Sequence, residues 1–279
     1  MSATILDGRH YAQDLQVQLA TVVARQQAER GRAPALVLVG VGDDETANLY
    51  ASQVERSCQR IGLQCLRRHF PVTITETALR TEVALLGARP DVDGVVLLLP
   101  LPRHIRQRVV TEVLPPEKDV DGLGPRNAGN MLLGFPSFVP STADAALELL
   151  QHAEIPLQGR HVVIVGRSNV GGKPAGLLFL RANATVTFCH SRTRDLASIT
   201  RQADVVFSSA GQPNTITADM LKPGVVVLDA GMNTVSGAVV GDVAFDDVCR
   251  VASYVTPVPG GLGPLTNLML IRHVVFGPR

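Results

Sequence analysis

The chain has 279 residues, of which 46% are hydrophobic and 18% charged, with 25 glycines and 18 prolines. This is the composition of an ordinary globular protein, and it excludes fibrous and disordered classes. The 26 Lys and Arg residues nearly balance the 25 Asp and Glu residues. Charge alone could not hold a nucleic-acid backbone, so we expect no nucleic acid as a partner. The length predicts one large domain or two of ordinary size.

The cysteine pattern and the N-terminal segment indicate a protein that is not secreted. The chain contains four cysteines, namely Cys58, Cys65, Cys189 and Cys249. They show neither a CxxC pair nor zinc-ligand spacing, so we expect thiols in a reducing compartment and no metal site. Asp7 and Arg9 interrupt the apolar stretch that a signal peptide needs. The most apolar run, 95–101, is much shorter than the ~20 residues that span a bilayer. We therefore expect a soluble, cytoplasmic protein without membrane contact.

Short apolar runs alternate with amphipathic stretches along the whole chain, which is typical of parallel strands buried between helices. We therefore expect an α/β fold. In the first half, the pattern predicts helices at Tyr11–Glu29, Thr46–Ile61 and Glu76–Leu86, and strands at Ala35–Val41, Gln64–Phe70 and Gly94–Leu99. The segment from Leu114 to Pro140 is dense in Pro, Gly and Asn, so it is predicted to be a loop with little regular structure. Long loops in compact domains are often functional.

A second α/β unit is predicted from about Ser141 onward. The pattern there predicts helices at Asp144–Gln151 and Pro174–Arg181, and strands at His161–Val165, Thr185–His190, Val205–Ser208 and Val225–Asp229. These spacings suit βαβ repeats and a nucleotide-binding domain. A Gly/Pro loop then leads to a last predicted helix, Asn267–Val275, which could return to the first domain. We therefore expect one domain at 1–140 with the C-terminal helix at about 267–279, and a second at 141–266.

The segment VVIVGRSNVGGKP is predicted to be a strand, a turn and the start of a helix. Gly166, Gly171 and Gly172 lie in its turn, where the absence of Cβ lets backbone amides at a helix N-terminus approach a phosphate. The spacing is not G-x-G-x-x-G, so a simple tight turn is the alternative.

The end of the next strand favours NADP over NAD. NAD sites usually carry an acidic residue there for the ribose 2′-hydroxyl, whereas an arginine suits a 2′-phosphate. Here the strand ends in His190, Ser191 and Arg192, and Arg167 lies in the preceding loop. Two guanidiniums and a hydroxyl can clamp a phosphate. The alternative is that both arginines are solvated surface charges.

Five segments of the chain resemble the motifs of the bifunctional methylenetetrahydrofolate dehydrogenase/cyclohydrolase family. They are PLPRH, KDVDGLGPRNAG, GRSNVGGKP, ATVTFCHSRT and TPVPGGLGPLT. They follow the family's order and, with Tyr50, extend to Thr266. The resemblance implies an N-terminal catalytic domain and a C-terminal Rossmann-like NADP domain, with a tetrahydrofolate derivative bound in a cleft between them, in a homodimer. The NADP contacts it implies are Gly166, Arg167, Ser168, Gly172, Ser191 and Arg192.

The resemblance also implies a set of substrate residues. Tyr50 matches a tyrosine that lies against the aminobenzoyl part of folate, and Asp121 matches an aspartate that accepts hydrogen bonds from the pterin. These two are the candidate catalytic residues. Pro259, Gly260 and Gly261 match a loop that closes over the ligand, with Gly263 in the same motif. Without the resemblance, Tyr50 would be a helix anchor, Asp121 a turn cap and the glycine loop a sharp connector.

The chain departs from the family at several positions. Where the family has its catalytic lysine in the pattern Y-x-x-x-K, this chain has Val54. Where the family has the glutamine that hydrogen-bonds this lysine, this chain has Leu98. Losing both together leaves no lone buried polar group. The family's histidine after KDVDG is Gly124, and its proline-cysteine-threonine-proline segment reads 140–143 as PSTA. We therefore expect the dehydrogenase to be kept and the cyclohydrolase to be weak or absent.

Two other functions remain open at this point. One is an enzyme that transfers the one-carbon group of methylenetetrahydrofolate to another acceptor. The other is a catalytically silent folate-binding partner. The retained Arg167, Ser191 and Arg192 argue against both, because a protein without redox chemistry has no evident need for an NADP clamp.

Overall fold

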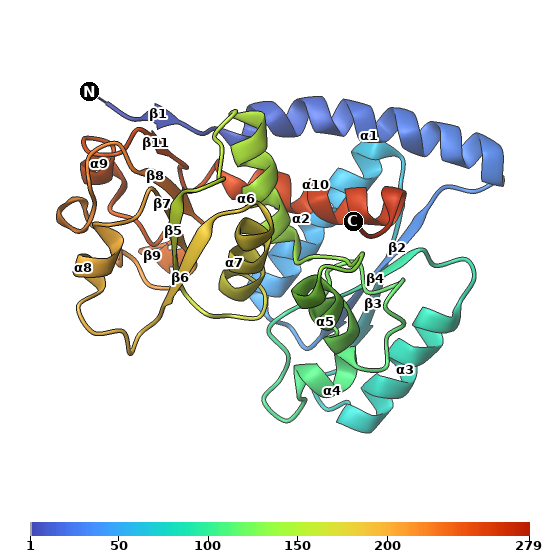
Figure 1. Cartoon of the computed structure of the whole chain (residues 1–279). Coiled ribbons are helices and arrows are strands. Elements are labelled where there is room, and N and C mark those ends of the chain that lie inside the picture. The colour runs from blue at the N-terminus through green and yellow to red at the C-terminus, as the bar shows by residue number, and fades with distance from the viewer. Residues whose placement is uncertain (1) are drawn as a thin grey trace. The chain divides into compact units, whose positions relative to one another are not determined.

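A computed structural model describes residues 2–279, which form two compact units (Figure 1). Unit 1 contains the residues up to Gln13 together with Thr142–Thr266. Unit 2 contains Asp14–Ser141 together with Asn267–Arg279. Each unit has its own parallel sheet, which confirms the expected α/β class. The divisions between the units fall within three helices, α1 (Gly8–Arg30), α6 (Ser141–His152) and α10 (Leu262–Phe276).

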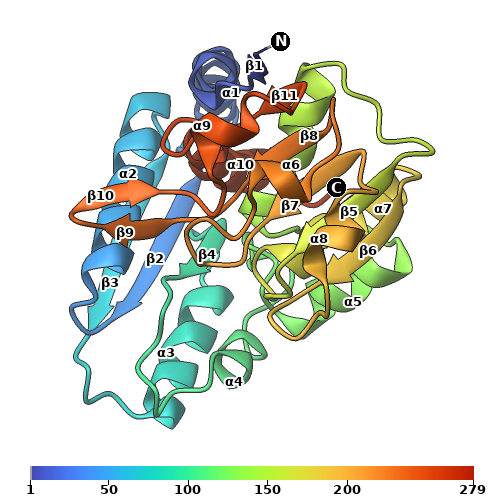
Figure 2. The same cartoon turned by 90° about the vertical axis from the view of Figure 1, so that its left-hand side faces the viewer.

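Unit 2 is built on a three-stranded parallel sheet in the order β3-β2-β4. Its strands are β2 (Ala35–Val41), β3 (Gln64–Phe70) and β4 (Gly94–Leu97). The central strand β2 is buried at every position, as expected for a parallel strand covered on both faces. Helix α2 (Glu45–Ile61) packs on β2 and β3, and α3 (Glu76–Ala88) packs on β4 (Figure 2).

The prediction of an irregular segment from Leu114 to Pro140 is wrong in part, because it contains the helix α5 (Pro125–Leu133). Pro125 occupies the first turn, where no backbone N–H is needed. Gly134 ends the helix in the left-handed conformation, with φ of 80°. The prolines and glycines that suggested a loop are therefore the start and stop signals of this helix. A shorter helix that was not predicted, α4 (Gln107–Thr111), precedes it.

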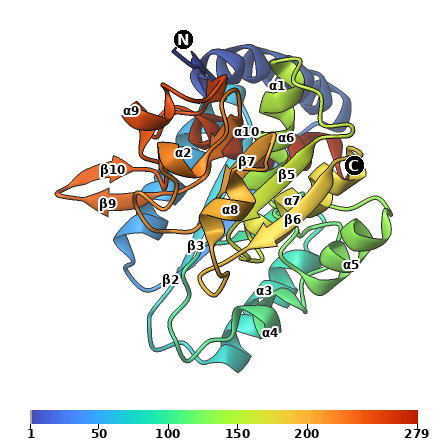
Figure 3. The same ribbon diagram turned by 60° about the vertical axis from the view of Figure 1, so that its left-hand side comes forward.

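Unit 1 is built on a six-stranded parallel sheet in the order β1-β11-β8-β7-β5-β6. Its strands are β1 (Thr4–Ile5), β5 (His161–Val165), β6 (Thr185–Cys189), β7 (Val205–Ser208), β8 (Val226–Asp229) and β11 (Tyr254–Val255). The chain passes from β5 to β6 on one side and then to β7 on the other (Figure 3). The strand order therefore reverses at the carboxyl ends of β5 and β7, the usual ligand-binding edge of an open α/β sheet.

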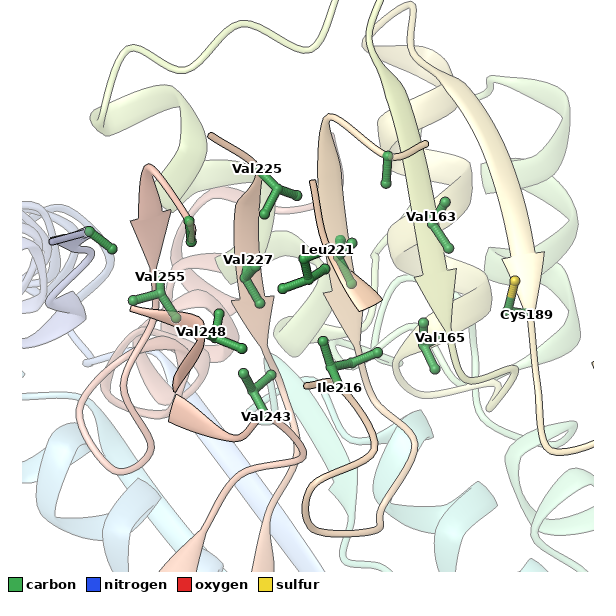
Figure 4. Packing of buried hydrophobic residues seen from close by; sticks show 14 residues of the cluster. Val163, Val165, Cys189, Ile216, Leu221, Val225, Val227, Val243, Val248 and Val255 are labelled. Atoms are coloured by element: carbon green, nitrogen blue, oxygen red, sulfur yellow. The ribbon is translucent and has the colours of Figure 1, made fainter. Parts of the chain in front are cut away.

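The core of unit 1 consists mainly of branched aliphatic side chains from these strands and from the segments that cover them. Figure 4 shows Val163, Val165, Val227 and Val255 of the sheet packed in one cluster with Ile216. The remaining elements are α7 (Gly172–Arg181), α8 (Leu196–Thr200), η1 (Ala218–Met220), β9 (Asn233–Val235), β10 (Ala238–Val240) and α9 (Phe245–Val248). Strands β9 and β10 project from the sheet as an antiparallel hairpin (Figure 3).

Three further properties concern the described residues 2–279 as a whole. No helix among them is both long and apolar enough to cross a membrane. All four cysteines are free, with Cys58 and Cys189 buried and Cys65 and Cys249 partly exposed. No cluster of three or more His, Cys, Asp or Glu side chains in this part of the chain could hold a metal ion.

Candidate functional site

The turn between β5 and α7 is too tight for any residue but glycine at two positions. Gly166 has φ of 124°, and a Cβ there would collide with the backbone of Ser209. A Cβ at Gly172 would collide with the carbonyl of Gly166. The Ser168 hydroxyl accepts a hydrogen bond of 3.0 Å from the Gly171 amide, which fixes the turn before the first residue of α7. The two glycines therefore let the chain fold back on itself between β5 and the start of α7.

A cavity of about 210 Å³ lies at the carboxyl ends of β5, β7 and β8. It is lined by Thr142, Ser168, Val170, Gly171, Ser209, Gly211, Ala230, Gly231 and Met232. The Ser209 hydroxyl oxygen is buried and has no hydrogen-bond partner among residues 2–279. An unpartnered hydroxyl beside a glycine turn, at the point where the strand order reverses, fits a dinucleotide site.

The predicted phosphate clamp lies at this same edge of the sheet. Strands β5 and β6 pair in parallel with Val165 opposite Cys189, so the turns that carry Arg167 and Arg192 follow neighbouring strands. Arg167, Ser191 and Arg192 are exposed. Within the described part of the chain neither arginine forms an ion pair, so both guanidiniums are available to an anionic ligand. Their role as a clamp stays a prediction.

Two buried acids next to the cavity were missed by the sequence analysis. Asp229 ends β8, and Asp242 follows the hairpin that was not predicted. Burial raises the pKa of Asp229 to about 6, against the opposing effect of its backbone hydrogen bonds from Asp242, Gly231 and Val243. The sequence signal that could have identified Asp242 is the GDV segment at 241–243. An acidic residue among apolar neighbours is expected to be buried, and a buried carboxylate needs hydrogen-bond donors.

In unit 2, the structure brings Tyr50, Asp121 and Ser141 together. Asp121 is buried, and its Oδ1 accepts hydrogen bonds from the Ser141 hydroxyl at 2.8 Å and the Ser141 amide at 3.2 Å. None of the described residues donates to its Oδ2, which is therefore the oxygen left for a ligand. Burial raises the pKa of Asp121, while the Ser141 bonds and the nearby His273 lower it.

The Tyr50 hydroxyl stays protonated at ordinary pH. Burial and, to a smaller extent, the charge of Asp121 raise the pKa of Tyr50, whereas a hydrogen bond with Ser141 lowers it. Tyr50 is thus a neutral phenol with a polar end beside Asp121 and a ring that can stack on a planar ligand.

A second carboxylate holds the loop that carries Asp121. Asp119 accepts hydrogen bonds from the amides of Leu123 at 3.1 Å and Gly124 at 2.8 Å, and from Asn127 Nδ2 at 2.9 Å. Burial raises the pKa of Asp119 to about 6. A Cβ at Gly124 would lie 2.9 Å from Asp119 Oδ2. A histidine at this position would therefore require Asp119 to move, so the glycine belongs to this network.

Val54 and Leu98 are buried apolar side chains. Val54 is fully buried on α2, one turn after Tyr50, and Leu98 is buried directly after β4. The Leu98 amide donates to the Val39 carbonyl at 2.8 Å, and its side chain approaches the backbone of Gly40 closely. Both positions therefore belong to packed core and supply no acid or base.

The predicted glycine loop is anchored on the start of α1, within unit 1. The Pro259 carbonyl accepts from Arg9 Nη2 at 3.2 Å, and the Gly260 carbonyl accepts from the Gly8 amide at 3.0 Å. Gly260 has φ of 119°, and a Cβ there would lie 2.7 Å from the Arg9 guanidinium.

The rest of this motif differs from the prediction, because α10 begins at Leu262 and Gly263 is therefore helical rather than part of the loop. Pro264 is tolerated in the first turn of that helix. A Cβ at Gly261 would come within 2.7 Å of the Pro257 carbonyl oxygen, so the loop itself needs glycine for its own geometry. The contact of Pro259, Gly260 and Gly261 with a ligand stays a prediction.

Both parts of the chain match models of one protein family. Residues 6–121 match the catalytic domain of tetrahydrofolate dehydrogenase/cyclohydrolase, and residues 140–277 match its NAD(P)-binding domain. The expected N-terminal catalytic domain and C-terminal Rossmann-like domain are thereby confirmed. The expectation of a nicotinamide dinucleotide cofactor is confirmed at the level of NAD(P).

Individual relatives resemble the chain over nearly its whole length. A bifunctional protein FolD of Geobacillus thermodenitrificans is 46% identical over 280 residues, which cover 100% of this chain and 98% of the relative. The crystal structure of bifunctional FolD from Campylobacter jejuni is 37% identical with a TM-score of 0.96, covering 99% of this chain and 98% of that one. The Trypanosoma brucei dehydrogenase-cyclohydrolase, complexed with NADP and an inhibitor, is 35% identical with a TM-score of 0.94, covering 98% and 96%.

Proposed function

Since the chain belongs to the tetrahydrofolate dehydrogenase/cyclohydrolase family, we propose that it oxidises 5,10-methylenetetrahydrofolate to 5,10-methenyltetrahydrofolate with NADP and hydrolyses the product weakly or not at all. One observation carries this proposal. Val54 and Leu98 are buried and apolar, whereas the glycine turn and the cavity at the end of β5 are intact. The proposal follows from the different chemical needs of the two reactions.

Oxidation mainly needs its two reactants to be positioned. A nitrogen lone pair of the folate expels the hydride from the methylene carbon, and bound NADP supplies the acceptor. Asp121 accepts hydrogen bonds from the pterin through its free Oδ2, while Ser141 holds its Oδ1. Tyr50 lies against the aminobenzoyl ring. No side-chain base is needed for this step.

The cofactor is held by the loops at the carboxyl edge of the sheet in unit 1. The turn at Gly166 and Gly172 lets backbone amides reach the phosphates. Arg167, Ser191 and Arg192 bind the 2′-phosphate, which makes NADP the preferred dinucleotide.

Hydrolysis of the methenyl product needs a water molecule to be activated and protons to be moved while the ring opens. A positioned acid–base group contributes about 10²- to 10⁴-fold to such steps. Val54 and Leu98 offer no group that can exchange a proton. We therefore infer that the methenyl compound leaves the enzyme as the product.

The two predicted domains are proposed to bind different ligands. Residues 1–140, with the C-terminal helix at about 267–279, supply the folate contacts, and residues 141–266 supply the NADP contacts. Pro259, Gly260 and Gly261 are proposed to close over the bound ligand.

We also propose that two copies of the chain form a homodimer along β6. Among residues 2–279 this strand is the last in its sheet and pairs only with β5. Phe188 on β6 is 44% exposed and Leu180 on α7 is 56% exposed. An unpaired edge with exposed apolar side chains is a common interface. Sedimentation of the wild type and of Phe188→Glu tests this: the wild type should sediment as a dimer and the variant as a monomer.

The activity is tested by incubating the purified protein with methylenetetrahydrofolate and NADP. The absorbance of NADPH and of the methenyl product are followed separately. We expect both to rise together, and the methenyl signal to decay only at the rate measured without enzyme. Rapid enzymatic decay would overturn the proposed loss of hydrolysis and leave the oxidation intact.

Two other outcomes correspond to the alternative functions. Loss of the methylene group without NADPH formation, in the presence of an acceptor, would indicate one-carbon transfer. Folate binding without turnover would indicate a silent binding partner. Either result would contradict the proposed oxidation.

A further inference from the structure

Asp242 is a fully buried carboxylate that accepts five hydrogen bonds. Three come from consecutive backbone amides, those of Ala210 at 2.6 Å, Gly211 at 3.2 Å and Gln212 at 3.1 Å. The other two come from the Ser208 hydroxyl at 3.1 Å and Asn233 Nδ2 at 3.0 Å. A carboxylate surrounded by donors in this way fixes the backbone that carries them.

The backbone that Asp242 fixes borders the candidate cofactor cavity. Residues 210–212 follow β7, and Gly211 lines the cavity next to Ser209, whose buried hydroxyl has no partner among the described residues. Asn233 begins the hairpin, directly after the cavity residue Met232. Asp242 therefore ties the loop after β7 to the base of the hairpin.

Asp229 connects the same region to the loop after β8. Its carboxylate accepts from the Gly231 amide at 2.8 Å, the Asp242 amide at 3.0 Å and the Val243 amide at 3.0 Å. Gly231 lines the cavity. Asp229 thus holds the backbone of Asp242, which in turn holds the loop at 210–212.

The strand order indicates which half of a bound dinucleotide would contact the loops after β7 and β8. In the order β8-β7-β5-β6, Arg167 and Arg192 follow β5 and β6, on one side of the point where the order reverses. The loops held by Asp242 and Asp229 follow β7 and β8, on the other side. Dinucleotides bind across this point. A 2′-phosphate at the arginines therefore directs the nicotinamide half toward the loops after β7 and β8.

We propose that Asp242 is a positioning residue for the nicotinamide half of the bound dinucleotide, acting through the loop 210–212. The proposal rests on the proposed function, since it requires NADP to bind at this edge of the sheet. Replacing the carboxylate by an amide of the same size removes acceptor capacity and turns an N–H group toward the backbone donors. The loop should then lose its geometry while the arginine side of the site is left intact.

The test is calorimetric binding of two probes to the full chain. One probe is NADP, and the other is 2′,5′-adenosine bisphosphate, which has the adenosine and 2′-phosphate but no nicotinamide. Asp242→Asn should weaken NADP at least 10-fold and change the affinity for the bisphosphate less than 2-fold. Arg192→Ala, as a matched control, should weaken both probes.

A third variant tests whether the effect of Asp242→Asn is a general loss of stability or a loss of positioning. Thr200→Val removes a buried hydroxyl that bonds the Met220 carbonyl, in a part of unit 1 that does not line the cavity, and should leave both affinities unchanged. If Asp242→Asn does not fold, Asn233→Ala, which removes one donor to the same carboxylate, should weaken NADP a few-fold and spare the bisphosphate. Equal weakening of both probes, or no effect on NADP, would overturn the inference. Failure of the wild type to bind either probe would instead contradict the proposed function.

Discussion

The two candidate ligand regions differ in which groups form them: one is formed mainly by the main chain, the other by side chains. In unit 1, the shape of the candidate cofactor cavity depends largely on the main chain, through the turn at Gly166 and Gly172 and through the amides held by Asp242. In unit 2, the candidate folate site depends on side chains, namely Tyr50 and Asp121. A site made of side chains can change its chemistry while its backbone stays the same.

Val54 and Leu98 illustrate this difference. Both are packed in the core, and the strand before Leu98 keeps its pairing with β2. The proposed replacement of a polar pair by this apolar pair would therefore need no change in the backbone of the fold. The glycine turn in unit 1 has no such freedom, because even a single Cβ would collide with the backbone.

The largest expected effect is the gain of hydrolysis when the polar pair is restored. Val54→Lys combined with Leu98→Gln should raise the rate of methenyl hydrolysis by about 10²-fold or more over the wild type. Val54→Lys alone should gain little, because burial without a partner lowers the pKa of the new amine and disfavours its charged form. The decay of methenyl absorbance at one pH measures this for the wild type, both single variants and the double variant. Equal gains from Val54→Lys alone and from the pair would contradict the need for a partner.

The next largest effect is expected at Asp121. Asp121→Asn should weaken folate binding by about 1.5–3 kcal/mol, the contribution of a hydrogen bond to a charged group. The affinity for NADP should hardly change. Ser141→Ala keeps the carboxylate and removes only one of its donors, so it should weaken folate less. Paired titrations with both ligands measure these effects. If Asp121→Asn leaves the folate affinity unchanged, Asp121 only caps a turn and does not bind folate.

A smaller effect is expected at the arginines. Replacing both Arg167 and Arg192 with Ala should raise the KM for NADP by about 10-fold, as expected for the loss of one or two charge-assisted contacts. The KM for NAD, which has no 2′-phosphate, should change much less. Steady-state kinetics with both cofactors measures the difference, and equal changes would show that the arginines do not read the 2′-phosphate.

The smallest effect concerns stability and pH in both units. Burial raises the pKa of Asp119 and of Asp229 to about 6, so each is protonated more readily in the folded chain than in the unfolded one. Their contribution to stability is complete below their ordinary pKa and is lost as the pH rises through about 6. Each acid should lower the free energy of unfolding by about 1 kcal/mol between pH 5 and pH 7.

Urea unfolding at a series of pH values measures this dependence. Asp229→Asn should remove the part of the pH dependence of the free energy of unfolding that comes from unit 1. Asp119→Asn should remove the part that comes from unit 2. The absolute stability of either variant is less informative than its slope against pH. A slope that stays as steep as in the wild type would mean that the acid concerned is not the titrating group.

Most of the regular elements could be predicted from the sequence because their signals are local. The strands Ala35–Val41, His161–Val165 and Val205–Ser208 have the predicted bounds, since short apolar runs between turns mark buried strands. Gln64–Phe70 also has the predicted bounds, although it is largely polar and exposed. The two-residue strands β1 and β11 could not be found in this way. They are strands only because they pair with each other and with β8, and such pairing is a property of the folded sheet.

The candidate sites were predictable to a different degree. The glycine turn and the arginines could be found because strand, turn and helix are consecutive in the chain. Asp242 could not be linked to the loop at 210–212, because its role depends on amides about 30 residues away that the fold brings next to it. The contact between Ser141 and Asp121 depends in the same way on packing between distant segments.

The pairing of β1 with β11 has a consequence for how unit 1 forms. Thr4 lies opposite Tyr254, and the Leu6 amide donates to the Val255 carbonyl. Contacts between residues so far apart in sequence slow folding, because a long loop must close before they form. During synthesis β1 must wait for its partner until β11, about 250 residues later, has been made. Until then β1 has no partner strand, and its backbone N–H and C=O groups are open to other strands.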